Sequence, residues 1–217
     1  MAAIRSLFHH VATNDPAALA IAQRVLAIPV KRAHTEVTHH LTPQEFDALV
    51  AAPDQRTSRG RRDRTLLLFL GRTGARVSEA LGINVCDRDL DRARPQVLLR
   101  GKGRKERIVP IANDLARPLR AFMRERGLKS QEEQPLFVGT HGERLTRFGA
   151  THTMRRMVAA ATLSRPELAS KSVSPHVLQN TLVMTLLQSG VDLLTIQAWL
   201  ATRRWPRRIA TRQPTSR

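Results

Sequence analysis

The 217-residue chain contains no tyrosine and few other aromatic residues, with six Phe and two Trp. Its single cysteine, Cys86, excludes an internal disulfide and fits a reducing cytosol. No apolar run approaches the length of a membrane span, and the N-terminal stretch MAAIRSLFHHVATND lacks the apolar centre of a signal peptide. We therefore expect a cytoplasmic protein with no membrane partner.

Acidic residues are also scarce, since 18 Asp and Glu stand against 36 Lys and Arg and give a formal net charge of +18. Nucleic acid is the default partner for so positive a chain, because Lys and Arg release counterions when they contact phosphates. A basic ribosome-associated or membrane-surface protein would carry the same charge with a smaller core. With 41% hydrophobic residues the chain can bury a core, so we expect a globular protein whose partner is nucleic acid.

The patterning along the chain predicts four parts. They are a helical segment over 1–34, a basic linker over 35–40, a main domain over 41–200, and an Arg-rich tail over 201–217. The tail has no apolar periodicity, and we expect it to be disordered.

A clear helix start opens the main domain. Thr42 is placed as the N-cap, Pro43 at the first helical position, and Glu45 as the residue that completes a capping box. The aliphatic run from Leu66 to Leu70 is predicted to be core. The domain is therefore expected to be mainly α-helical, with a small antiparallel β-hairpin or sheet. PQVLLRGKGRKERIVPI is expected to form the hairpin.

The last helical pattern, VDLLTIQAWL, predicts a short helix whose apolar residues point mostly inward. Those residues are Val191, Leu194, Ile196 and Leu200.

Three cationic or polar residues from distant segments could converge on a phosphate: Arg76, Lys102 and His176. Arg offers a planar fork for two phosphate oxygens, and Lys or His can donate a proton to a leaving oxygen. Two of them also have an ordinary structural interpretation, since Arg76 could be a helix-surface residue and His176 a helix cap. Arg104 and Lys105 are either phosphate contacts or part of a solvated turn, and no metal site is expected.

Three blocks of sequence, in this order, resemble the signatures of the tyrosine recombinase (phage integrase) family: TGARVSEALGI, GKGRKERIVPI and SPHVLQNTLVMTLLQSGVDLLTIQAWL. The chain is close to integrases of bacterial insertion elements and transposons, and the likeness covers about 41–200. The likeness implies double-stranded DNA as the partner and a nucleoid-associated location. It implies the DNA breaking-rejoining catalytic fold, with 1–34 as the remnant of a helical, SAM-like core-binding domain. Three ordered blocks are specific, whereas one alone is weak.

The resemblance also implies roles for residues. Members of the family cleave DNA with a tyrosine hydroxyl, form a 3′-phosphotyrosyl link without metal or cofactor, and act on DNA as tetramers. By position, Arg76, Lys102 and His176 would be catalytic, and Glu79 would orient Arg76. DNA contacts are expected from the residues of the hairpin, namely Arg100, Arg104, Lys105 and Arg107.

The chain departs from the family at three catalytic positions. Gln179 stands where the family has its second Arg, Thr202 stands where it has its second His, and no nucleophilic Tyr is present. By descent the function would be site-specific recombination or integration for a mobile element, but this chain should be defective in cleavage and deficient in assembly. The alternatives are a non-catalytic, sequence-specific DNA-binding regulator and a pseudogene product.

The tail after Leu200 can be spelled with synonymous codons so that the neighbouring frame reads Gly-His and then Tyr at the family's spacing. That Tyr codon would straddle Ala210 and Thr211. We therefore interpret 201–217 as the product of a frameshift, with a separately evolved basic tail as the alternative.

Overall fold

The computed structural model describes residues 2–28, 39–101, 106–129 and 132–200. The chain forms two compact units, Met1–Val37 and Thr38–Arg217. None of the helices in the described ranges has the length and apolarity needed to span a bilayer.

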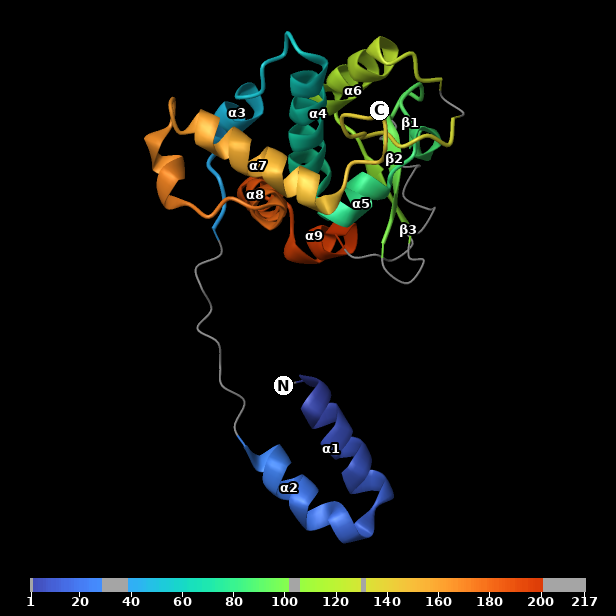
Figure 1. The fold of residues 1–217 in the computed structure, drawn as a ribbon, viewed down its shortest axis with the longest axis vertical. Helices are drawn as coiled ribbons and strands as arrows, with labels where there is room; N and C mark the ends of the chain where they lie inside the picture. The colour runs from blue at the N-terminus through green and yellow to red at the C-terminus, as the bar shows by residue number, and fades with distance from the viewer. Residues whose placement is uncertain (1, 29–38, 102–105, 130–131, 201–217) are drawn as a thin grey trace, which may run out of the picture. The chain divides into compact units, whose positions relative to one another are not determined.

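The first unit is a helical hairpin built from α1 (Ala2–Asn14), the short 3-10 helix η1 (Pro16–Ala18) and α2 (Leu19–Ala27) (Figure 1). The turn between the helices forms where the Asp15 side chain accepts a hydrogen bond from the Ala17 backbone N–H at 3.0 Å. Arg5 ties the two helices together by donating to the Ile28 carbonyl at 3.0 Å. Ala22 is its one fully buried residue in the described range. The assignment of this unit to a core-binding domain remains a prediction.

The second unit is mainly helical with a small antiparallel sheet, which confirms the fold class predicted from the sequence (Figure 1). Its helices are α3 (Pro43–Ala51), α4 (Ser58–Thr73), α5 (Val77–Gly82), η2 (Val85–Asp87), α6 (Asn113–Glu125), α7 (Arg147–Ala161), η3 (Pro166–Ser170), α8 (Pro175–Gln188) and α9 (Leu193–Leu200). Its strands are β1 (Arg88–Asp89), β2 (Gln96–Arg100) and β3 (Glu106–Pro110).

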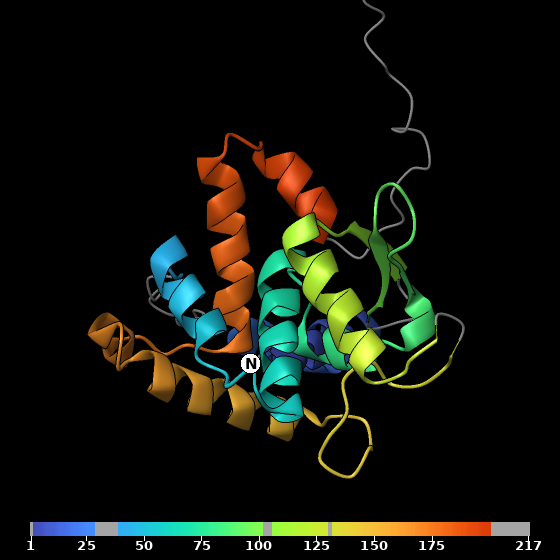
Figure 2. The ribbon, with the colours of Figure 1, turned by 90° about the horizontal axis from the view of Figure 1, so that it is seen from above.

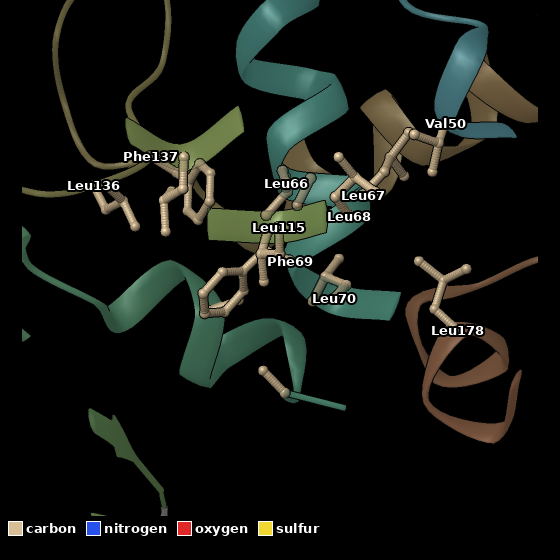
Figure 3. Packing of buried hydrophobic residues seen from close by; sticks show 14 of the residues in the cluster. Val50, Leu66, Leu67, Leu68, Phe69, Leu70, Leu115, Leu136, Phe137 and Leu178 are labelled. Carbon is tan, nitrogen blue, oxygen red and sulfur yellow. The ribbon is translucent and has the colours of Figure 1, made fainter. Parts of the chain in front are cut away.

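Helix α4 lies at the centre of this unit, with α6 and α8 on opposite sides (Figure 2). The five consecutive residues from Leu66 to Leu70 are all buried, as predicted, because neighbours cover α4 on every side. Figure 3 shows these side chains among the aromatic residues of the core. The Phe137 ring meets Phe69 edge-on at 5.8 Å between centroids and stacks on Phe122 at 6.2 Å. This packed core fixes the end of α4, from which the candidate site begins.

The sheet has the strand order β1-β2-β3, and both pairs are antiparallel. In β2 and β3, Leu99 lies opposite Arg107 and Val97 lies opposite Val109. These four side chains share the inner face and are buried, while their neighbours along each strand face outward. The hairpin strands were predicted from this alternation, but the two-residue strand β1 is too short to show one.

The N-terminus of α3 and the apolar residues of α9 were both predicted from the sequence. At α3, the Thr42 side chain accepts from the Glu45 N–H and the Glu45 carboxylate accepts from the Thr42 N–H, which confirms the capping box. At α9, Ile196 is buried as predicted, but the inward placement of Leu194 is wrong because its side chain is 77% exposed. The described neighbours of this short helix cover only one narrow side of it.

Candidate functional site

The site begins at the turn between α4 and α5. The Thr73 hydroxyl donates to the Phe69 carbonyl at 2.6 Å and accepts from the Ala75 N–H at 3.2 Å. Gly74 ends α4 in the left-handed conformation at φ +62°, which suits a residue without a side chain. The chain then extends, and Arg76 becomes the N-cap residue of α5. Arg76 therefore precedes the helix rather than lying within it.

A single buried carboxylate, that of Glu79, holds this turn and the sheet together. It accepts hydrogen bonds from the Arg76 backbone N–H at 2.9 Å and from Arg76 Nη1 at 3.0 Å. It also accepts a two-pronged contact from Arg107, whose Nη1 and Nη2 lie at 3.0 and 2.8 Å. The Glu79 side chain is 2% exposed, whereas that of Arg76 is 54% exposed. Two guanidinium groups thus share one carboxylate, so the cluster carries a net charge of +1. The Arg76 guanidinium is the one that faces solvent.

Arg107 does not lie where a DNA contact requires it to lie. The family resemblance implies a DNA contact at Arg107, but this residue is only 4% exposed. The period of β3 could have revealed this, because Arg107 is two residues from the buried Val109 and therefore shares its inward face. Its position makes it a support for Glu79 and, through Glu79, for Arg76.

Arg100 is half-exposed at the end of β2 and is held by two carboxylates. Its Nη1 contacts Asp87, and its Nε donates to Glu106 at 3.1 Å. The hydrogen bond to Asp87 raises the pKa of Arg100 above its usual value. Arg100 can reach an anion only in competition with these two partners.

Helices α8 and α9 pack against the turn that carries Arg76. A Cβ atom added to Gly74 would lie 2.7 Å from Leu200 Cδ2 and 3.0 Å from Leu182 Cδ2. Gln179 lies three residues before Leu182 on α8, so both are on one face of the helix. His176 is exposed on the first turn of α8, and Gln179 is half-buried. The fold therefore brings α8 to the Arg76 turn, with a neutral residue at position 179.

Four of the predicted site residues, Lys102, Arg104, Lys105 and Thr202, lie outside the described residues, and their roles remain predictions. In the described ranges, no group of three or more His, Cys, Asp or Glu residues could hold a metal ion.

Two buried charge clusters that the sequence did not predict brace the helices around the site. Asp63, fully buried on α4, accepts from Arg62 Nε at 2.9 Å and from Arg156 Nη2 of α7 at 2.6 Å. Lys171 donates to the buried Glu45 at 2.6 Å and so links the segment before α8 to α3. The pairs of Asp63 with Arg156 and of Glu45 with Lys171 join residues far apart in sequence, so no periodic pattern predicts them.

Comparison with known proteins decides the family. Residues 39–204 match the phage integrase family. The chain belongs to this family. A putative integrase/recombinase of Sinorhizobium fredii is 63% identical over 182 residues, which cover 84% of this chain and 65% of that relative.

Solved structures of tyrosine recombinases share the integrase fold of this chain. The crystal structure of XerA recombinase aligns with a TM-score of 0.62 and 26% identity, over 82% of this chain and 58% of that one. The pre-cleavage complex of XerH site-specific recombinase bound to its difH substrate aligns with a TM-score of 0.61 and 25% identity, over 74% and 46% of the two chains. The present chain spans less than two thirds of the length of the curated relatives it matches first.

Proposed function

We propose that this integrase-family chain binds double-stranded DNA and grips a backbone phosphate with Arg76 and His176, without cleaving the strand. The observation that carries the proposal is the buried Glu79 carboxylate, which holds Arg76 and Arg107 together while leaving half of the Arg76 side chain exposed. By descent, the activity would be site-specific recombination or integration for a mobile element. This chain retains the DNA binding of such an enzyme but not its strand cleavage.

Electrostatics support a phosphate as the ligand of Arg76. Two guanidinium groups against one carboxylate leave one positive charge, and Glu79 fixes the Arg76 fork before any ligand arrives, so less conformational entropy is lost on binding. The net charge of +18 favours DNA over other anions. The similarity to XerH, solved with its difH substrate, supports the same class of partner.

The absence of tyrosine from these 217 residues supports the loss of cleavage. Covalent catalysis in the family requires a tyrosine hydroxyl, and a serine or threonine without an activating base is a poor substitute. Gln179 further weakens the phosphate clamp, because a neutral amide replaces a second positive charge. Such a chain would act as a non-catalytic regulator that occupies sites used by active recombinases, with weakened assembly on DNA.

The proposal is tested by measuring DNA binding of Arg76→Gln at several salt concentrations, using a duplex that carries the ends of the encoding element. Loss of one phosphate contact should weaken binding about tenfold and reduce the slope of log K against log salt by about one. Arg117→Gln, an exposed substitution on α6, is the matched control for lost charge. Equal effects of the two substitutions would contradict a specific role for Arg76.

A further inference from the structure

Arg88 differs from the other buried charged residues of the described chain. Each of the others forms an ion pair, namely Glu45, Arg62, Asp63, Glu79, Asp87 and Arg107. Arg88, on β1, is 6% exposed, and its Nε, like that of Arg107, is buried without a hydrogen-bond partner. No ion pair of Arg88 occurs within the described ranges. A buried charge without a direct partner is costly, and a bound anion would offset that cost.

The position of Arg88 explains its burial. It lies opposite Val97 in the sheet, so its side chain shares the inner face with that fully buried valine. Burial lowers the pKa of Arg88, and the charges of Asp91 and Asp89 offset this only in part. Asp89 is already engaged by Arg92, whose Nε lies 2.5 Å from its carboxylate. The nearby acidic residues therefore leave the Arg88 charge without a direct partner.

Arg88 lines a pocket of about 360 Å³ between β1 and the C-terminal half of α6. Arg120 and Arg124 line the same pocket with one carboxylate, Asp91, which gives the lining a net charge of +2. The Arg120 Nη2 donates to the Leu90 carbonyl, which holds this guanidinium at the wall. The pocket is open to solvent, and its volume is at the lower end of the range of small-molecule sites.

A helix C-terminus carries partial negative charge, which would repel an anion. This repulsion is reduced at the end of α6. Its Phe122, Met123 and Arg124 carbonyls already accept hydrogen bonds from the N–H groups of the next turn. Leu128 adds an apolar wall.

We propose that this pocket binds a small phosphorylated molecule of nucleotide size. Arg88, Arg120 and Arg124 line the pocket, and guanidinium groups are suited to phosphate oxygens. The apolar side chain of Leu128 can cover an organic moiety. The pocket borders α6, on the opposite side of α4 from α8 (Figure 2). The proposal does not depend on the DNA-binding function.

The test is calorimetric titration of the full chain with AMP, inorganic phosphate and adenosine. AMP and phosphate should bind, AMP more tightly, and adenosine should not. Arg124→Gln should weaken AMP binding at least tenfold, whereas Arg117→Gln, on the same helix but outside the pocket lining, should leave it unchanged. Circular dichroism of each variant checks that the fold is retained.

Arg88→Met provides a second, independent readout. Phosphate should raise the melting temperature of the unsubstituted protein, and it should not raise that of Arg88→Met. If this variant fails to fold, the Arg124→Gln titration still decides the matter. Failure of both AMP and phosphate to bind, or binding equally strong in Arg124→Gln, would overturn the proposal. A DNA-binding defect of Arg124→Gln without AMP binding would also overturn it, in favour of a DNA contact.

Discussion

At the scale of residues, the Glu79 carboxylate is the group on which the site depends. The Glu79 side chain is 2% exposed, and its carboxylate pairs with two guanidinium groups. One of these belongs to Arg107, whose side chain is only 3% exposed. Glu79→Gln would leave that buried charge uncompensated. We expect the free energy of unfolding to fall by about 3–5 kcal/mol, measured by urea denaturation.

Glu125→Gln is the matched control, because Glu125 pairs with Arg61 in a partly exposed setting. Its loss should cost under about 1 kcal/mol. Similar losses in the two variants would show that Glu79 contributes no more than a surface pair.

A second prediction at this scale concerns the stability of the protein at acidic pH. Burial alone would raise the pKa of Glu45, but the hydrogen bond and charge of Lys171 and the Thr42 N–H outweigh burial and lower it below its usual value near 4.5. A carboxyl group whose pKa is lowered by folding stabilises the protein above its unfolded-state pKa, and that contribution is lost as the pH falls through the folded-state value.

Urea midpoints should therefore drop between pH 5 and pH 3, and Glu45→Gln should show a smaller drop because the titrating group is gone. An identical pH profile for the variant would show that other carboxyl groups account for the acid loss.

The single residues of the site were only partly predictable. The motif TGARVSE placed Arg76 and Glu79 one turn apart, and a short local motif is enough to bring two such residues together. The pairing of Glu79 with Arg107 joins residues 28 positions apart, and that pairing depends on the sheet packing against α5. Patterns within one element carry no information about such contacts.

At the scale of elements, the turn after α4 couples the Arg76 segment to α8 and α9. Gly74 combines a φ of +62° with close contacts to Leu182 and Leu200. Gly74→Ala should therefore be destabilising both through backbone strain and through overpacking, with the second contribution costing about 1–3 kcal/mol. Thermal unfolding measures the difference.

Gly190→Ala separates the two contributions. Gly190 also has a positive φ, of +81°, but a Cβ atom there would meet nothing within 4 Å. It should cost about 1 kcal/mol from the left-handed backbone alone. If Gly74→Ala costs no more than Gly190→Ala, the packing of α8 and α9 on this turn is looser than the contacts indicate.

Elements with strong local signals were predictable. The capping box of α3 and the alternation of β2 and β3 each follow from a few neighbouring residues. The exposure of Leu194 was not predictable in this way, since an eight-residue apolar helix does not indicate how many of its sides will be covered. Strand β1 was missed because two residues are too few for a period.

At the scale of the whole molecule, the charge of +18 and the packed core around α4 describe a folded, strongly basic protein. A decayed gene product with a disrupted core would unfold without cooperativity. We expect instead that Thr38–Arg217 unfolds in a single cooperative thermal transition, measured by far-UV circular dichroism. A broad, non-cooperative melt would favour the pseudogene alternative.

The claim that the chain grips DNA without cutting it is tested most directly with a nicked duplex that traps covalent intermediates of tyrosine recombinases. The duplex carries the ends of the mobile element that the proposed function assigns to this chain. Products are separated on a denaturing gel after binding has been verified on a native gel. We predict a retarded complex on the native gel, weakened by Arg76→Gln, and no covalent protein–DNA adduct on the denaturing gel. A covalent adduct formed by these 217 residues would contradict the account.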